Sequence, residues 1–364
     1  MVESSPGGRV SHRSGPQGRD PRVKTLRAEA RVVGPNFLVA SEGIRRQFDS
    51  VIIATGAWFQ VPAFIGSRKQ GVFILDGPRA YADLGVSAAS SEEVAVVGEG
   101  FRALQVADRL SRGRSRVHLV VSEWQHEGPS PLILGLLAGA ARENGVLFAE
   151  GMLSKAVGTG TLEAVMTDSE VIACSVLAVV PRRIPKVPST GARLGRLGGL
   201  MVDRCMRTSL SGMFAVGGCA ELDTKGAPSV TLEGEASFSG RIGGANCMGE
   251  EHSMSLVRFS EATAFGLRWT RVGLGFREAR ASGLLVGSAD RRWESSACEI
   301  LYERASMRVV GVEEAAPIES FPSGVVPISS GVSLRTLAYG GLGSSDISLV
   351  SETARLGLRE WQES

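Results

Sequence analysis

The stretch from Glu92 to Val121 has the clearest pattern of apolar and polar positions in the chain. An apolar run, Val94 to Val97, stops at Gly98, and the apolar residues that follow recur at helical spacing, at Leu104, Ala107 and Leu110. A second β-branched run covers residues 117–121. Short continuous apolar runs are typical of buried strands, and spacings of three and four share one face of a helix. The pattern therefore predicts strand, glycine turn, helix and strand, which is a βαβ unit.

The turn inside this unit has glycine or alanine at positions 98, 100 and 103, in the pattern GxGxxA. We expect Gly98 to permit the tight turn, Gly100 to let a pyrophosphate lie against bare backbone, and Ala103 to let the helix pack closely on the strand. A phosphate could then bind at the helix N-terminus. The turn predicts dinucleotide binding, with a purely structural glycine turn as the alternative, and Phe101 and Arg102 belong to the same candidate site.

Further short apolar segments lie on both sides of the unit. Before it, we expect an antiparallel meander over 26–48 and a buried strand, 49–56, that ends in the small residues Ala54, Thr55 and Gly56. After it, we expect a helix at 131–144, strands between 146 and 180, a strand at 208–218 that ends in Gly217 and Gly218, and a helix at 234–248. The last hundred residues predict a separate α+β domain, with a hairpin of strands 298–302 and 307–312 and helices near 331–340 and 345–358.

Composition limits the classes of function. With 364 residues, 43% of them hydrophobic, the chain can bury several cores. Forty basic residues against 38 acidic ones leave a net charge of +2, which argues against a nucleic-acid or anionic-membrane surface. No apolar run reaches the roughly eighteen residues that a membrane helix needs. The five cysteines form no CxxC pair, and from this we infer a reducing cytoplasm.

Other chemical motifs are weak. The histidines at 118, 126 and 252, with Glu123 and Glu127, do not have the spacing of a metal site, so we expect no bound metal. There is no GxSxG nucleophile turn and no P-loop, which disfavours a hydrolase or an NTPase. No catalytic residue is assigned.

The order of these segments resembles the pyridine nucleotide-disulfide oxidoreductase superfamily, in particular its NADH oxidase and coenzyme A-disulfide reductase branch. Four stretches are similar in order to the first crossing out of the FAD domain, the NAD(P)H loop, the second FAD motif and the dimerisation domain: 51–56, 96–110, 208–221 and 263–283. The resemblance implies an α/β fold with two interleaved Rossmann-like dinucleotide-binding domains and a C-terminal α+β dimerisation domain. It also implies a homodimer that passes hydride from NAD(P)H to FAD.

The chain departs from the family pattern in its flavin half. Nothing before Val32 resembles the family's first strand, its FAD phosphate loop or its redox cysteine, and Gly218 stands where the family has a ribityl-binding aspartate. The resemblance therefore implies an incomplete FAD domain in which flavin binding is doubtful. We expect the missing segment to come from an upstream start or from a separate polypeptide.

The nicotinamide loop departs from the pattern as well. The ribose-binding carboxylate of the family would fall on Val121, with Glu123 two places later. The basic residues at 112, 114, 116 and 118 lie near in sequence, so NADP stays open beside NAD, although a solvated helix end is the commoner role for such arginines.

These observations predict five parts of the chain: a flexible tail (1–22), a partial FAD-binding domain (23–85), an NAD(P)-binding Rossmann domain (86–185), the second part of the FAD-binding domain (186–252) and a dimerisation-like domain (253–364). The predicted function is an NAD(P)H-dependent FAD oxidoreductase, truncated or split at its N-terminus. A non-catalytic NAD(P)-binding regulatory or structural protein is the alternative.

Overall fold

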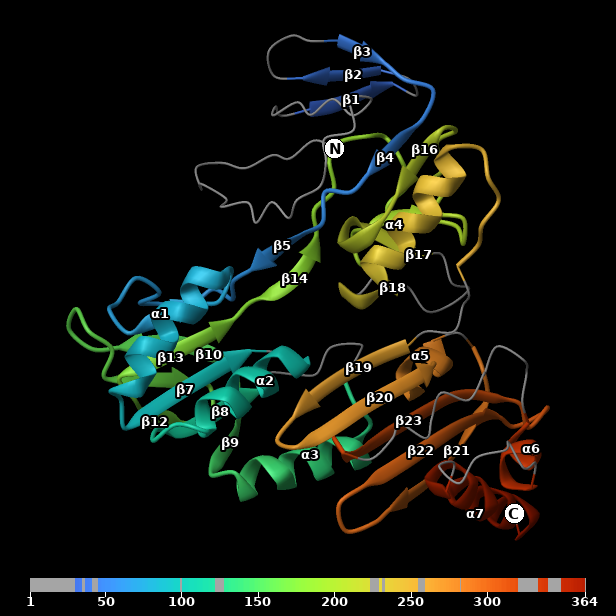
Figure 1. Cartoon of the computed structure of the whole chain (residues 1–364). Helices are drawn as coiled ribbons and strands as arrows, with labels where there is room; N and C mark the ends of the chain where they lie inside the picture. The colour runs from blue at the N-terminus through green and yellow to red at the C-terminus, as the bar shows by residue number, and fades with distance from the viewer. Residues whose placement is uncertain are drawn as a thin grey trace. The chain divides into compact units, whose positions relative to one another are not determined.

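The computed structural model describes residues 30–34, 37–40, 45–98, 100–121, 128–222, 229–230, 233–254, 259–281, 283–319, 333–339 and 348–363 (Figure 1). The chain divides into two compact units, each made of two separate stretches. Unit 1 contains residues 1–58 and 183–254, and unit 2 contains residues 59–182 and 255–364.

A five-stranded parallel sheet forms the centre of unit 2, in the order β6-β13-β7-β8-β9. Its strands are β6 (Val72–Ile74), β13 (Val176–Val180), β7 (Glu93–Gly98), β8 (Arg116–Val121) and β9 (Val146–Glu150). All four ladders are parallel. Strands β7 and β13 are apolar throughout their central positions, because both faces of a parallel sheet are covered.

Different layers cover the two faces of this sheet. Val94 and Val96 of β7 belong to a core shared with α1 (Pro78–Ala89), α2 (Gly100–Ser111) and α3 (Pro131–Glu143). Ala95 and Val97 face the opposite core, which is shared with the small antiparallel sheet β10-β11-β12 (Leu153–Val157, Ala164–Thr167 and Val171–Ala173). The predicted βαβ unit is confirmed, and β6 and α1 join it from a stretch in which the sequence predicted neither. The domain boundary expected between 85 and 86 falls inside α1.

The C-terminal part of unit 2 is an antiparallel sheet in the order β19-β20-β23-β22-β21. The strands are β19 (Phe259–Ala264), β20 (Leu267–Gly273), β23 (Val309–Pro317), β22 (Ala297–Glu303) and β21 (Val286–Arg292). The helices are α5 (Phe276–Ala281), α6 (Leu334–Tyr339) and α7 (Ser348–Glu363), of which α7 packs on β21 and β22. The predicted hairpin is confirmed as β22 and β23.

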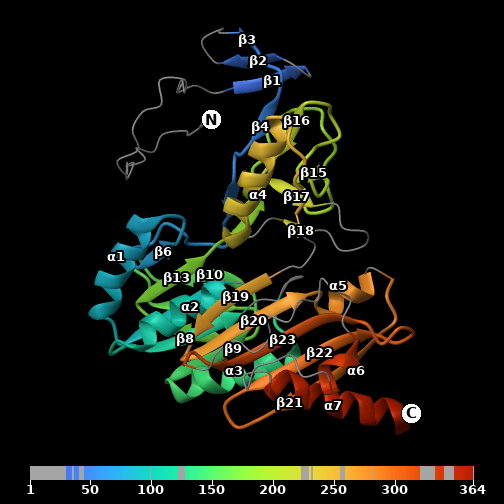
Figure 2. The same cartoon turned by 45° about the vertical axis from the view of Figure 1, so that its right-hand side comes forward.

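This antiparallel sheet shares a core with the parallel one. Helix α2 packs on β7 and β8 and also on β19, and α3 packs on β9 and also on β22 and β23 (Figures 1 and 2). Ala264, Trp269 and Ala315 therefore belong to the same buried cluster as Val94 and Val96. The part of unit 2 that contains the parallel sheet and the C-terminal part are thus fixed to each other by packed side chains.

Unit 1 is made of small sheets. Strands β1 (Ala30–Gly34), β2 (Phe37–Ala40) and β3 (Arg45–Gln47) form the predicted antiparallel meander. Strands β4 (Val51–Ile53) and β16 (Met213–Ala215) form a two-stranded parallel ladder, and the 3-10 turn η1 (Gly217–Cys219) follows β16.

The remaining elements of unit 1 are a third sheet and a helix. The sheet contains β15 (Leu200–Val202), β17 (Ala220–Leu222) and β18 (Ser229–Val230), and α4 (Glu233–Cys247) is the predicted helix. Strands β5 (Ala57–Gln60) and β14 (Arg182–Pro185) form a two-stranded sheet in which both unit boundaries fall.

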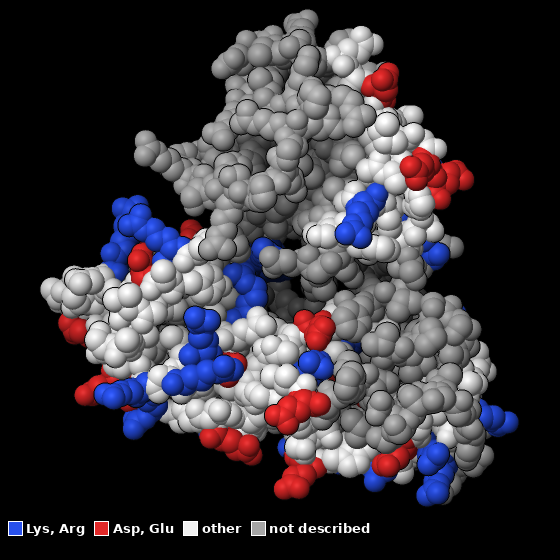
Figure 3. All heavy atoms as spheres, in the orientation of Figure 1, with Lys and Arg blue, Asp and Glu red and all other residues white. Residues whose placement is uncertain are grey.

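The surface of the described residues shows no single-sign region on the face drawn in Figure 3, where basic and acidic side chains are interspersed. This agrees with the near-zero net charge of +2. Within the described part of the chain, no helix has both the length and the apolarity to cross a bilayer.

Candidate dinucleotide site

The candidate site lies where β7 ends and α2 begins. Strand β7 is flanked by β8 on one side and by β13 on the other. After β7 the chain adds β8 and β9 on one side and later adds β13 on the other side, so the strand order reverses at β7. Open α/β sheets bind ligands in the crevice at the carboxyl ends of strands at such a switch point. Gly98 lies at this edge, with Val180 of β13 and Val121 of β8 as its register partners.

The two glycines of the turn have different structural roles. Gly100 has φ +70°, in the left-handed region that favours glycine, and a Cβ built there would meet no heavy atom within 4 Å. Gly98 does not have a positive φ, so its backbone conformation does not itself require glycine. Glycine is needed at position 98 because β13 leaves no room for a side chain there. A Cβ at Gly98 would lie 2.6 Å from Val180 Cβ and 2.8 Å from the Val180 carbonyl oxygen.

The backbone at Gly100 is open on the side where a side chain would lie. It adjoins the N-terminus of α2, a helix of twelve residues, where the first N–H groups have no partner within the helix and attract an anion. Ala103 is 1% exposed and lies in the core between α2 and the sheet, which confirms the close packing expected of a small residue. Glu99, between the glycines, lies outside the described residues.

Arg102 contacts the carboxyl ends of two neighbouring strands. Its Nη1 donates to the Pro181 carbonyl oxygen at 3.2 Å, and its Nη2 lies 3.2 Å from the Tyr81 hydroxyl and 3.5 Å from the Leu75 carbonyl oxygen. Its guanidinium also stands 5.3 Å from the centre of the Phe59 ring. Leu75 and Pro181 directly follow β6 and β13, so this side chain places a positive charge at the carboxyl ends of the strands.

The Phe101 side chain packs against the C-terminal sheet. Its ring stacks on Trp269 of β20, with ring centroids 4.2 Å apart and an interplanar angle of 25°. The sequence placed Phe101 with the dinucleotide-binding residues, and the structure shows that its side chain contacts the C-terminal sheet.

The basic residues near the turn lie at the other end of the sheet. Arg116 and His118 are in the first half of β8, and both bind the Glu93 carboxylate, at 2.8 and 2.7 Å. Arg112 pairs with Asp108 at 2.8 Å. Strand β7 begins at Glu93 and ends at Gly98, five residues later. At roughly 3.3 Å per residue, these two residues are about 16 Å apart. Arg116 and His118 therefore cannot reach a 2′-phosphate at the carboxyl edge, while Glu123, Glu127 and His126 lie outside the described residues.

The flavin-side candidates of unit 1 lie together at the ends of β4 and β16. Ala54, Thr55 and Gly56 follow β4, and Gly217 and Gly218 follow β16, its parallel partner. The Thr55 hydroxyl donates to the Lys186 carbonyl oxygen, and the Lys186 N–H donates to the Gly56 carbonyl oxygen at 2.9 Å. Gly56 and Gly217 have φ of +73° and +67°. The two turns lie side by side, since a Cβ at Gly218 would lie 3.5 Å from the carbonyl carbon of Gly56.

Glu221, the acidic residue that follows Gly217 and Gly218 in the sequence, has a structural role. Glu221 is 2% exposed, and its carboxylate accepts from Leu197 N at 3.0 Å and from Gly199 N at 3.1 Å. Gly195 must be glycine, because a Cβ there would lie 2.0 Å from the Glu221 carboxyl carbon. Glu221 is therefore held in the loop before β15 and does not replace the carboxylate that Gly218 lacks.

Three of the five cysteines are buried, and all five are free thiols. Burial raises the pKa of Cys174 to about 12, with Glu93 adding to the effect, and burial also raises the pKa of Cys298. Cys219 Sγ lies 3.4 and 3.3 Å from the Ile53 and Val216 carbonyl oxygens. Because the thiolate is the reactive form, burial of Cys174 and Cys298 disfavours their reaction.

Comparison with known proteins agrees with this architecture. The family model described as "Pyridine nucleotide-disulphide oxidoreductase" matches residues 17–239. The chain belongs to this family. The expected superfamily and the Rossmann-like α/β fold are thus confirmed.

Individual members of the family are distant from this chain. An NADH oxidase of Streptococcus pneumoniae is 28% identical over 201 residues, which are 53% of this chain and 44% of that protein. A mercuric reductase of Acidithiobacillus ferrooxidans is 24% identical over 325 residues, 82% of this chain and 56% of that protein. The chain thus spans about half the length of these relatives. The solved NAD-dependent persulfide reductase from A. fulgidus superposes with a TM-score of 0.80 at 20% identity, over 92% of this chain and 68% of that one, which shows a shared fold.

Proposed function

We propose that this chain is an NAD(P)H-dependent flavoprotein oxidoreductase, in which unit 2 binds the nicotinamide dinucleotide at the β7–α2 turn. The observation that carries the proposal is Gly100: a left-handed glycine with open space beyond its Cα, at the start of a helix and at a switch point of a parallel sheet. Two similar proteins are named NADH oxidase and NAD-dependent persulfide reductase, which supports the same cofactor.

The chain's own residues would bind and orient the dinucleotide. The first N–H groups of α2 would hold the pyrophosphate against Gly100, and Arg102 would place a cation at the neighbouring strand ends. The dinucleotide, when bound, supplies a hydride, for which no protein side chain is an acceptor. The choice between NADH and NADPH then depends on groups other than Arg116 and His118, which lie at the far edge of the sheet.

The flavin side of the proposal is only partly supported by unit 1. Gly56 and Gly217 line two adjoining turns, but β4 and β16 form a two-stranded ladder. In the described part of unit 1, no glycine turn leads from a strand directly into an α-helix, so aligned N–H donors for a second pyrophosphate are not identified there. We therefore propose weak FAD binding by this polypeptide alone. A further segment, with a strand and a glycine turn, would complete the flavin site.

Assembly and location are also part of the proposal. The C-terminal sheet and α5–α7 correspond to the region that resembles a dimerisation domain, and we propose a homodimer formed through it. The five free cysteines favour a reducing compartment such as the cytoplasm. Sedimentation of the chain as a monomer at micromolar concentration would contradict the dimer.

The experiment is to purify the chain, record its visible spectrum with and without added FAD, and follow both NADH binding and NADH oxidation. We expect NADH to bind, FAD to bind weakly, and oxidation to be slow until a flavin-binding segment is supplied. A yellow protein with stoichiometric flavin would contradict weak FAD binding. NADH binding without oxidation, even with that segment present, would favour the alternative of a non-catalytic NAD(P)-binding protein.

A further inference from the structure

We propose that Trp269 and Glu313 of the C-terminal sheet are positioning residues for the dinucleotide site, because together they fix the N-terminal ends of both α2 and α3. The inference rests on the proposed dinucleotide binding in unit 2. It gives a role in ligand binding to a region in which the sequence indicated only packing or an interface.

The first contact reaches α2. Phe101 follows Gly100 directly, in the first turn of this helix, and its ring stacks on Trp269 at a centroid distance of 4.2 Å. Trp269 is 4% exposed and cannot move without repacking the shared core. The backbone of the glycine turn is thereby held from outside by a side chain of β20.

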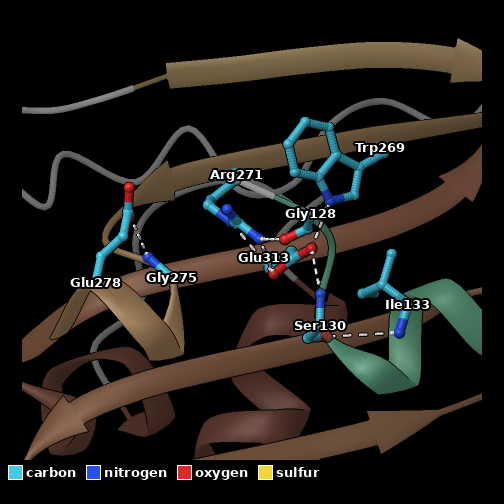
Figure 4. Close-up of polar contacts among 8 residues, drawn as sticks. All are labelled: Gly128, Ser130, Ile133, Trp269, Arg271, Gly275, Glu278 and Glu313. Atoms are coloured by element: carbon cyan, nitrogen blue, oxygen red, sulfur yellow. Dashed lines mark hydrogen bonds and ion pairs between the residues drawn. The ribbon is translucent and has the colours of Figure 1, made fainter. Parts of the chain in front are cut away.

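The second contact reaches α3 through a carboxylate (Figure 4). Trp269 Nε1 donates to Glu313 Oε1 at 2.6 Å, and the same oxygen accepts the backbone N–H of Ser130 at 3.0 Å. Ser130 is the N-cap of α3, where its hydroxyl accepts from Ile133 N at 3.5 Å. Glu313 therefore lies at the positive end of this helix and binds a donor that the helix itself leaves free.

Arg271 completes the cluster. Its Nη2 lies 2.9 Å from Glu313 Oε2 and donates to the Gly128 carbonyl oxygen at 2.5 Å. Arg271 and Glu313 are 7% and 5% exposed, so the pair is taken out of water. Two charged groups thus hold the segment that leads into α3 at both Gly128 and Ser130.

The location of these contacts connects them to binding. In a parallel βαβ arrangement, each helix begins at the carboxyl edge of the sheet, so the N-termini of α2 and α3 both lie at the edge where a dinucleotide binds. Helix α2 follows β7 and α3 follows β8, the pair of strands whose ends meet at Gly98 and Val121. The Trp269–Glu313 pair is one rigid connection between the two helix starts.

The chemistry of the cluster favours positioning over stability. A buried ion pair contributes little net stability compared with apolar groups of the same size, but its hydrogen bonds fix the distance and direction of each partner. Ligand-binding groups need support of this kind to stay within about 0.5 Å of the productive geometry.

The test is Trp269→Phe, which keeps an aromatic ring against Phe101, removes the Nε1–H donor and makes the buried side chain smaller. The control is Trp293→Phe, the same change at a half-buried residue that directly follows β21 and packs against the separate C-terminal core. Glu313→Gln is the second variant, and it removes the negative charge of the ion pair with Arg271 with little change of shape. Dissociation constants for NADH and for ADP, which shares the adenosine and the diphosphate, are measured well below each variant's melting temperature.

We expect both ligands to bind Trp269→Phe about threefold to tenfold more weakly, as for the loss of one hydrogen bond, and Trp293→Phe to bind them like the wild type. Glu313→Gln should raise the dissociation constants of both ligands by at least the same factor. The inference is wrong if folded Trp269→Phe and Glu313→Gln bind NADH and ADP as the wild type does, or if Trp293→Phe loses as much. If the wild type binds neither ligand, the proposed function itself fails, and the inference fails with it.

Discussion

Gly100→Ala separates the two reasons for which glycine can stand at this turn. The substitution adds one methyl group where the structure has free space and where we expect the pyrophosphate. It also forces a non-glycine residue to adopt φ +70°, which costs about 1–2 kcal/mol in any protein. A loss of binding alone would therefore be ambiguous, because the strain could disturb the turn.

Gly145→Ala is the matched control. Gly145 follows the C-terminus of α3, has φ +75°, and likewise has no heavy atom within 4 Å of an added Cβ. It lies just before β9, at the edge of the sheet opposite the candidate site. The two variants therefore carry a similar backbone strain, and they should lower the melting temperature by similar amounts.

Only Gly100→Ala should weaken the binding of the dinucleotide. Displacing the phosphate from one charge-assisted hydrogen bond costs about 1.5–3 kcal/mol, which is one to two decades of affinity at about 1.4 kcal/mol per decade. Titration calorimetry with NADH, and with NADPH in parallel, measures the difference. Equal affinities for the two variants would refute the assignment of the pyrophosphate to Gly100.

Three other expectations follow from the geometry. Arg116→Ser should leave the ratio of NADH to NADPH affinity unchanged, because Arg116 binds Glu93 at the far edge; a shifted ratio in the same titrations would contradict this. Burial raises the pKa of Glu299, and a hydrogen bond from Ser130 offsets this only in part. The carboxyl group therefore holds its proton more tightly in the folded protein than in the unfolded one. Its contribution to stability falls as the pH rises above the unfolded pKa of 4.5. Glu299→Gln should therefore gain melting temperature over the wild type at pH 7 and not near pH 4; a gain independent of pH would be the opposing result. Gly98→Ala should destabilise unit 2 by about 1–3 kcal/mol through overlap with Val180, and an unchanged melting temperature would show that β13 can move aside.

The βαβ unit was predictable from the sequence because its signals are local. The apolar run of β7, the glycines and the spacing of α2 all fall within thirty residues, and their order alone identifies the turn. The antiparallel meander and the β22–β23 hairpin were found for the same reason. The strands β19 and β20 were missed, because polar and charged residues such as Glu261, Arg268 and Arg271 interrupt both segments and leave no apolar run.

The interactions around the site could not be predicted, because they join distant parts of the chain. Ser130 and Glu313 are 183 residues apart in sequence, and Gly98 is glycine because of Val180 on another strand. Glu313 and Glu314 in the apolar strand β23 were the one available signal, since a carboxylate inside a buried strand needs a partner. The sequence does not specify which partner it finds.

Calorimetric titration of the intact 364-residue chain with NADH and NADPH tests the central claim most directly. The account predicts saturable binding of at least one of the two at one site per chain, which Gly100→Ala weakens and Gly145→Ala does not. Absence of binding by both dinucleotides to the folded wild-type protein would contradict it.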